Sequence, residues 1–312
     1  MRIAGDAVVV DGLTKTFADV KALDRVSLTA GRGEVFGLLG PDGAGKTTLM
    51  RILCGIMPAD SGSVVVAGED VRLRPEQVKP RIGYLSQRFA LYRDLSVEEN
   101  VRFTAQIFGV GRDEYRARLD ELLAITRLAP FTDRPAGKLS GGMKQKLALM
   151  CCLIHRPEVL LLDEPTTGVD PASRRDFWHL LRDLPEQGVT VIVSTPYMDE
   201  AERCDRLALL HHGRMVAVGA VDEIKDRVAG ALFGITAEPQ AQARDVLAGL
   251  PDVRGVVVFG DRLHVSASAG TSIESLLVRL RGAGVNIEHA EPIEAGLEDA
   301  FAELVGGESH VG

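Results

Sequence analysis

The spacing of apolar residues changes several times between residues 8 and 220. Residues 8–36 combine short apolar stretches with turn residues, which predicts antiparallel strands. Residues 206–220 predict a hairpin whose turn is His212-Gly213. Residues 89–156 contain mainly helical patterns and should form a helical subdomain. Almost entirely apolar runs, typical of strands buried in a parallel sheet, are 34–39, 159–162 and 189–194. This order predicts an α/β fold with a mixed sheet at its core.

After residue 228 the pattern predicts a second, smaller domain. Its expected elements are a strand at 231–237, a helix at 240–250, a hairpin at 253–267, a helix at 272–284 and a strand at 285–293. This βαββαβ order is ferredoxin-like, and residues 295–307 add an amphipathic closing helix. We therefore expect one domain over residues 1–228 and a small α+β domain over residues 229–312. No ligand-binding constellation is visible in the small domain, which favours a dimerisation or regulatory module over a small-molecule sensor.

Composition narrows the classes of function. The 312 residues, 46% of them hydrophobic, suffice for a large core, and the net charge of −8 argues against a nucleic-acid partner. No apolar run approaches the roughly 18 residues that cross a bilayer, and the first residues lack a signal-peptide pattern. The four cysteines have neither metal-ligand nor redox spacing. We expect a soluble chain that reaches a membrane only through a partner.

The segment Gly40–Thr47 has the phosphate-loop pattern GxxxxGK[ST], and it lies between an apolar strand and a helical pattern. Its glycines let the backbone wrap a phosphate with N–H groups pointing inward. Lys46 is expected to reach the β- and γ-phosphates, and the Thr47 hydroxyl to bind Mg²⁺. The residues expected to bind the nucleoside triphosphate here are Gly40, Pro41, Asp42, Gly43, Ala44, Gly45, Lys46, Thr47 and Thr48.

An acid pair follows the apolar run that ends at Leu162. Ligands of doubly wound sheets lie at the carboxyl ends of the strands, where Asp163 and Glu164 are expected. Asp163 can hold Mg²⁺ through water, and Glu164 is placed to polarise the water that attacks the γ-phosphate. The sequence therefore predicts a site that binds a nucleoside triphosphate with Mg²⁺, with Lys46 and Glu164 as its candidate catalytic residues. Proteins with such a site include kinases, GTPases, helicases and transport ATPases.

The segment Leu139–Gln145, LSGGMKQ, resembles the LSGGQ signature of ABC ATPases. The Ser140 hydroxyl and the N–H groups of Gly141 and Gly142 should form an anion site at a helix that begins near Met143. In this family the site binds the γ-phosphate held by the phosphate loop of a second subunit. The resemblance thus implies a head-to-tail dimer that encloses two ATP molecules.

Three further landmarks of the resemblance extend it over residues 8–229. Phe17 occupies the position of the aromatic residue that stacks on adenine, and Asp170 that of the D-loop aspartate at the dimer interface. Gln87 is in the glutamine-loop position, which implies that it senses Mg²⁺, takes part in catalysis and contacts a membrane partner. No guanine-recognition motif of the NKxD type is present, so ATP is expected rather than GTP.

The segments YRDLSVEENV, DEPTTGVDP and YMDEAERCDR resemble the ATP-binding subunits of bacterial ABC-2 exporters, closest to the YbhF-like efflux group. The resemblance implies integral-membrane ABC-2 permease subunits and a second ATPase subunit, identical or different, as partners. It also implies a peripheral location on the cytoplasmic face of the inner membrane and drugs or other efflux cargo. The alternative is a soluble ABC ATPase acting on nucleic acid or ribosomes, but paired ATPase domains, a coiled-coil insertion and a basic face are not visible.

One position departs from the family pattern. Most ABC ATPases have a histidine after the strand at 189–194, where it contacts the γ-phosphate and the attacking water, and this chain has Pro196. Proline has neither a side-chain donor nor an N–H. We therefore expect slow hydrolysis, or a site completed by Ser194, Tyr197 or an unusual water arrangement. A purely structural interpretation also fits, because proline suits the first turn of a helix.

Overall fold

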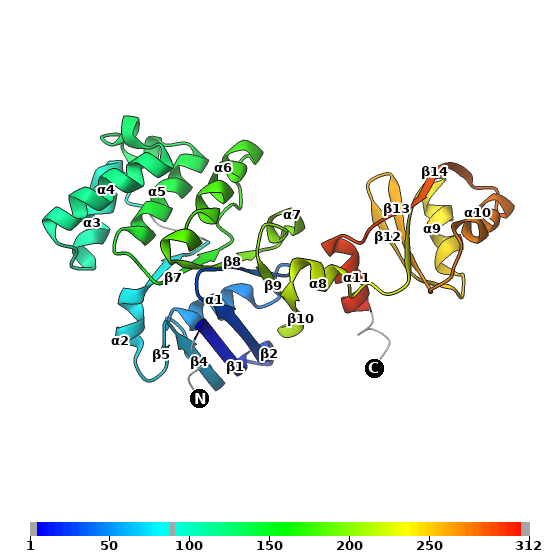
Figure 1. Cartoon of the computed structure of the whole chain (residues 1–312), viewed down its shortest axis with the longest axis horizontal. Helices are drawn as coiled ribbons and strands as arrows, with labels where there is room; N and C mark the ends of the chain where they lie inside the picture. The colour runs from blue at the N-terminus through cyan, green and yellow to red at the C-terminus, as the bar shows by residue number, and fades with distance from the viewer. Residues whose placement is uncertain (1–4, 88–90, 307–312) are drawn as a thin grey trace. The chain divides into compact units, whose positions relative to one another are not determined.

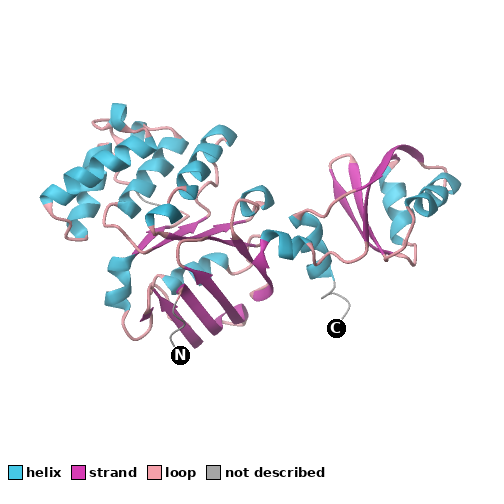
Figure 2. Cartoon of the chain, viewed as in Figure 1, coloured by secondary structure: helices cyan, strands magenta, loops and turns pink. Residues whose placement is uncertain are grey.

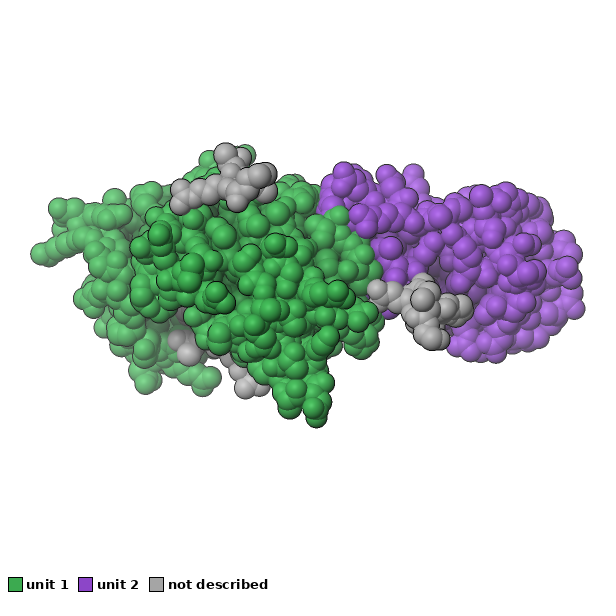
Figure 3. Space-filling model, turned by 90° about the horizontal axis from the view of Figure 1, so that it is seen from below, with its two compact units in different colours: residues 1–218 green, residues 219–312 purple. Residues whose placement is uncertain are grey.

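The computed structural model describes residues 5–87 and 91–306, and the chain divides into two compact units (Figure 3). The first unit is residues 1–218 and the second is residues 219–312. The division therefore falls before the boundary expected between residues 228 and 229. The physical reason is that α8 (Val221–Lys225) contacts α11 (Leu297–Gly306), so this short helix packs within the C-terminal unit.

A six-stranded sheet forms the centre of the first unit (Figure 1). Strands β6, β7, β8, β3 and β9 are parallel neighbours, so their carboxyl ends meet at one edge of the sheet. All residues of β3, β7 and β8 are buried, which explains why most of their residues are apolar. In spatial order the strands are β10 (Arg214–Ala220), β9 (Arg206–His211), β3 (Val35–Leu39), β8 (Thr190–Thr195), β7 (Val159–Asp163) and β6 (Ile82–Leu85).

A second sheet in this unit is antiparallel, and most of it comes from residues 8–36, for which antiparallel strands were predicted. One apolar core joins the two sheets, and the helix α1 (Lys46–Leu53) contributes Leu49 and Met50 to it. Figure 1 shows α1 lying between the two sheets. The strands of the antiparallel sheet, in spatial order, are β2 (Val20–Gly31), β1 (Asp6–Phe17), β4 (Ser61–Val66) and β5 (Glu69–Asp70).

Most helices of the first unit cluster on one side of it, above the six-stranded sheet in the view of Figure 2. The Ser96 side chain caps the helix that begins at Val97, in a reciprocal capping box with Glu99. The expected start of the helical subdomain at residue 89 lies outside the described residues. No helix within residues 5–87 and 91–306 combines the length and the apolar character needed to cross a bilayer. The helices are α2 (Pro75–Val78), α3 (Val97–Ile107), α4 (Arg112–Thr126), α5 (Gly141–Leu153), α6 (Pro171–Arg182) and α7 (Met198–Ala201).

The C-terminal unit has the predicted order of strand, helix, hairpin, helix and strand. Its four strands form an antiparallel sheet in the spatial order β12, β13, β11, β14. A separate apolar core contains Ile235, Leu263 and Val265 from the sheet and Leu247 and Leu280 from the two helices. The elements are β11 (Ala231–Glu238), α9 (Gln240–Ala248), β12 (Val253–Phe259), β13 (Arg262–Ala267), α10 (Ile273–Gly282) and β14 (Asn286–Pro292).

Candidate nucleotide-binding site

The predicted phosphate loop joins the end of β3 to the start of α1. Two of its glycines are required by their surroundings. A Cβ atom on Gly40 would lie 2.3 Å from the carbonyl oxygen of Leu210, and one on Gly45 would lie 2.4 Å from that of Ala22. Gly45 also has a φ of 108°, a region that side chains disfavour. The loop therefore packs backbone against backbone at both glycines.

Lys46 is buried at the start of α1. Its Nζ donates to the carbonyl oxygens of Gly40 and Pro41 at 2.8 and 3.0 Å. The same ammonium forms an ion pair with Glu164 Oε1 at 3.1 Å, and both side chains are at least nine-tenths buried. The structure therefore brings together Lys46 and Glu164, two of the three residues that the sequence analysis predicted to be catalytic.

Hydroxyl and carboxylate oxygens meet beside this ion pair. Thr47 Oγ1 and Ser194 Oγ donate to Asp163 Oδ1 at 3.1 and 2.8 Å. The other carboxylate oxygen, Asp163 Oδ2, is buried and has no hydrogen-bond partner in the protein. Burial raises the pKa of Asp163 above its ordinary value, against the opposing effect of these hydrogen bonds.

This oxygen set fits Mg²⁺. The ion binds proteins through hard oxygen ligands, commonly one or two carboxylates, and completes its shell with water and substrate phosphates. Thr47 Oγ1 and the unpartnered Asp163 Oδ2 are oxygens of this kind. The described residues contain no group of three or more His, Cys, Asp or Glu that could hold a metal. A site that shares Mg²⁺ with ATP does not require one.

Glu164 stands at a sharp turn after β7. Its φ of 49° is uncommon for a residue with a side chain, and its N–H donates to the Ser194 backbone and hydroxyl oxygens at 3.1 and 3.0 Å. Gln87 Nε2 donates to Glu164 Oε2 at 2.9 Å. Lys46 thus binds one carboxylate oxygen of Glu164 and Gln87 binds the other. These two contacts fix the orientation of the carboxylate.

A cavity of about 290 Å³ lies beside Lys46. The sequence predicted six of its lining residues and missed four. Val20, Lys21 and Ala22 were missed although they closely follow Phe17, while His212 carries no local signal. Phe17 ends β1, is 45% exposed and does not line the cavity. The lining residues are Val20, Lys21, Ala22, Gly43, Gly45, Lys46, Thr47, Thr48, Glu164 and His212.

The signature segment lies on a second cavity, of about 350 Å³, which Gly141 and Gln87 line together with residues 167–169. Ser140 caps α5 by accepting a hydrogen bond from Met143 N at 3.3 Å, so the helix begins at Gly141 rather than near Met143. A Cβ on Gly142 would lie 2.5 Å from the side chain of Ser173 in α6, so this glycine permits close helix packing.

Asp170 caps α6. Its Oδ1 accepts a hydrogen bond from Ser173 N at 3.0 Å, and this bond lowers the pKa of the Asp170 carboxyl. Neither Ser140 nor Asp170 lines the cavity around Lys46. Both are exposed at helix starts, which is where a second subunit could reach them.

Pro196 lies between β8 and α7, but not in the first turn of the helix. Tyr197 is the N-cap residue and α7 begins at Met198, so the expected first-turn placement is wrong. Ser194 and Tyr197 are the two residues that were expected to replace the missing histidine. The Ser194 hydroxyl donates to Asp163. The centroid of the Tyr197 ring lies 4.5 Å from the guanidinium carbon of Arg174.

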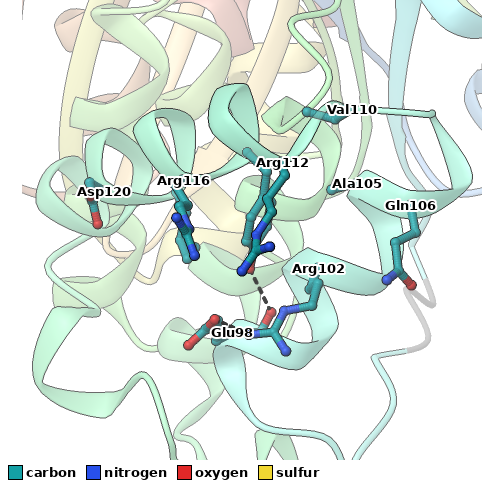
Figure 4. A pocket seen from close by; sticks show the side chains of 10 residues that line it. Glu98, Arg102, Ala105, Gln106, Val110, Arg112, Arg116 and Asp120 are labelled. Atoms are coloured by element: carbon teal, nitrogen blue, oxygen red, sulfur yellow. Dashed lines mark hydrogen bonds and ion pairs between the residues drawn. The ribbon is translucent and has the colours of Figure 1, made fainter.

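A larger cavity, of about 760 Å³, lies between α3 and α4 and contains none of the nucleotide-motif residues. Figure 4 shows the side chains of Arg112 and Arg116 pointing from α4 toward Glu98 and Arg102 of α3, which form an ion pair. This cavity is therefore a charged feature of the helical region and not part of the candidate ATP site.

Comparison with known proteins adds independent evidence. Residues 23–167 match the family model described as ABC transporter. The chain is 43% identical over 216 residues to the probable multidrug ABC transporter ATP-binding protein YbhF of Escherichia coli (strain K12), which covers 68% of this chain. It spans only 37% of the length of YbhF. It is 38% identical over 313 residues to the daunorubicin resistance ATP-binding protein DrrA3 of Streptomyces coeruleorubidus, covering 99% of both chains.

A solved structure has the same fold over the first unit. The dimeric post-hydrolysis state of the ATP-binding cassette MJ0796, bound to ADP and Pi, matches with a TM-score of 0.63 and 27% identity. The match covers 68% of this chain and 98% of that one. With a full-length relative at 38% identity and the family's motifs assembled as described, this chain belongs to the ATP-binding subunits of ABC transporters.

Proposed function

We propose that this chain hydrolyses ATP with Mg²⁺ and thereby powers an ABC-2 exporter of drugs or related small molecules. The observation that carries the proposal is the meeting of Lys46, Glu164 and Gln87 beside the Thr47–Asp163 pair at the carboxyl edge of the sheet. The relatives' printed names, a probable multidrug ABC transporter protein and a daunorubicin resistance protein, support the cargo class.

Each residue has a role that follows from its contacts. Lys46 is a buried cation at the end of the phosphate loop, positioned to neutralise the negative charge of the β- and γ-phosphates. Thr47 and Asp163 would hold Mg²⁺, which when bound offsets phosphate charge. Glu164, held by Lys46 and Gln87, would orient and polarise the attacking water. Phe17, exposed at the end of β1, would stack on adenine.

A second ATPase subunit completes the proposed site. Ser140, Gly141 and Gly142 start α5, and a helix start of this kind binds anions through free N–H groups. Asp170 starts α6, which packs against α5. We propose that these exposed helix starts face the phosphate loop of the partner subunit in a head-to-tail dimer.

The C-terminal unit is proposed to be ferredoxin-like and to serve dimerisation or regulation. Its element order and the sheet order β12, β13, β11, β14 support this assignment. None of the nucleotide motifs lies in residues 219–312, so a direct role in hydrolysis has no support.

Replacing Pro196 with histidine is expected to raise kcat, because the imidazole would restore a donor that acts on the transition state. Donors of this kind are worth about 100- to 1,000-fold. The affinity for ATP should change little, since the gain belongs to the transition state. The test measures kcat, the dissociation constant for ATP and the melting temperature of Pro196→His, with Pro196→Ala as the control for loss of the ring. An unchanged kcat in a stable Pro196→His chain would show that another group already fills the role.

The permease is proposed to dock on the helical region, at the cytoplasmic face of the inner membrane. Large apolar side chains are exposed there: Phe103 and Ile107 lie four residues apart on α3, and the Tyr92 ring packs edge-on against Phe103. An exposed apolar patch rimmed by charge is typical of an interaction surface.

Changing Ile107 to glutamate should abolish co-purification with the permease from membranes while leaving ATP binding intact, because Ile107 is 64% exposed and lines no nucleotide cavity. Val278→Glu is the matched control, since Val278 is 62% exposed on α10 of the other unit. The measurement is a pull-down from solubilised membranes of cells that express both proteins. Equal capture of the two variants would contradict the docking surface. Recovery of the wild-type chain with ribosomes or nucleic acid instead would favour the alternative soluble function.

A further inference from the structure

Glu200 is a buried carboxylate that none of the nucleotide motifs includes. It lies in α7, and only 1% of the residue is exposed. Its Oε1 accepts a hydrogen bond from Thr166 Oγ1 at 2.5 Å, and its Oε2 accepts one from Thr195 Oγ1 at 2.7 Å. Arg174 Nε lies 3.4 Å from Oε1. A buried charge is stable only when it is paired and hydrogen-bonded, and Glu200 meets both conditions.

The three partners come from three segments around the proposed catalytic site. Thr166 lies two residues after Glu164, in the turn that leads to Asp170. Thr195 is the last residue of β8, after Ser194, whose hydroxyl binds Asp163. Arg174 belongs to α6, and its N–H donates to the Asp170 carbonyl oxygen at 2.9 Å. One carboxylate thus joins the segment after Glu164, the segment before Pro196 and the first turn of α6.

The hydrogen bond between Thr195 and Glu200 also positions the segment that contains Pro196. While the Thr195 hydroxyl donates to Glu200, it accepts a hydrogen bond from Tyr197 N at 3.0 Å, which closes a small turn over Pro196. The Arg174 guanidinium that pairs with Glu200 also lies over the Tyr197 ring. Both residues that flank Pro196 are therefore tied, directly or through one partner, to Glu200.

We propose that Glu200 is a positioning residue for ATP hydrolysis. It acts by holding the segments of Glu164, Pro196 and Asp170 in one fixed arrangement. The inference rests on the proposed function. A carboxylate is needed because both oxygens accept hydrogen bonds, one from Thr166 and the other from Thr195, and because its charge pairs with the Arg174 guanidinium. Glutamine has the same size, but its NH₂ group would face a hydroxyl donor or a guanidinium. Glu200 does not line the cavity beside Lys46, so the effect should fall on turnover and not on ATP binding.

The test compares full-length Glu200→Gln with the wild-type chain. We expect kcat to fall about 10- to 100-fold, the cost of a small misplacement of catalytic groups. The dissociation constant for ATP should stay within about twofold, because the phosphate loop is untouched. The matched control is Asp199→Asn, which removes an exposed carboxylate from the same helix and should leave both quantities unchanged.

Thr195→Val supplies a second variant with a milder change, because it keeps the shape of the side chain and loses only the hydroxyl. It should reproduce the fall in kcat, and the double variant with Glu200→Gln should fall no further than Glu200→Gln alone. If Glu200→Gln does not fold, Thr195→Val alone decides the matter. An unchanged kcat in whichever variant folds, or an equal loss of ATP affinity, overturns the positioning role. A wild-type chain without Mg²⁺-dependent turnover would instead overturn the proposed function itself.

Discussion

Replacing Glu164 with glutamine should lower the rate of ATP hydrolysis by about 100- to 10,000-fold, the usual contribution of a positioned general base. ATP binding should be retained or become tighter. In the structure the Glu164 carboxylate holds the Lys46 ammonium at 3.1 Å, so the phosphates of ATP must compete with it for this cation. Glutamine keeps the size of the side chain but removes the competing charge and the ability to polarise water.

The glutamine variant should also accumulate as a dimer with ATP, because the enclosed nucleotide is no longer cleaved. Size-exclusion chromatography with and without ATP measures this, and a phosphate-release assay measures turnover. Glu158→Gln is the matched control: it makes the same substitution immediately before β7, where Glu158 pairs with Arg32 on the surface. A Glu164→Gln chain that elutes as a monomer in both conditions would contradict ATP-driven dimerisation of the isolated subunit.

The parts of the site that could be predicted from the sequence are those in which neighbouring residues act together. Lys46 and Thr47 belong to one continuous loop, and Asp163 and Glu164 end one apolar run. Once the strands are known to be parallel, their carboxyl ends must share an edge, and the ion pair between Lys46 and Glu164 follows. The buried strands could also be predicted from the sequence, because strands covered on both faces are mostly apolar.

Other parts depend on how distant segments fold together, and no local pattern encodes them. His212 reaches the cavity beside Lys46 because β9 lies next to β3 and because, just after β9, Gly213 N donates to the Ala44 carbonyl oxygen at 3.0 Å. Glu200 looks like an ordinary acidic residue in the first turn of a helix, and only the tertiary structure places Thr166 and Arg174 beside it. The place of α8 in the C-terminal unit has the same origin, since its contacts with α11 span most of that unit.

Replacing Lys46 with alanine should weaken ATP binding by about 10- to 100-fold. A hydrogen bond to a charged group is worth about 1.5–3 kcal/mol, and each 1.4 kcal/mol corresponds to about a tenfold change in affinity. The substitution also has a second effect, because it leaves the Glu164 carboxylate unpaired, and this effect must be measured separately from the loss of phosphate binding. Without the ammonium, the buried Glu164 carboxylate loses its cation, which destabilises the fold and places an unpaired negative charge beside the phosphates.

The double variant Lys46→Ala with Glu164→Gln separates these effects. Glutamine removes the unpaired charge, so the melting temperature should recover while ATP affinity remains well below that of Glu164→Gln alone. Lys79→Ala, which removes a surface lysine paired with Glu76, is the control for loss of one positive charge. Calorimetric titration with ATP and thermal melts measure both quantities. If the double variant binds ATP as tightly as Glu164→Gln, the Lys46 ammonium contributes nothing to phosphate binding, and repulsion by Glu164 accounts for the whole effect of Lys46→Ala.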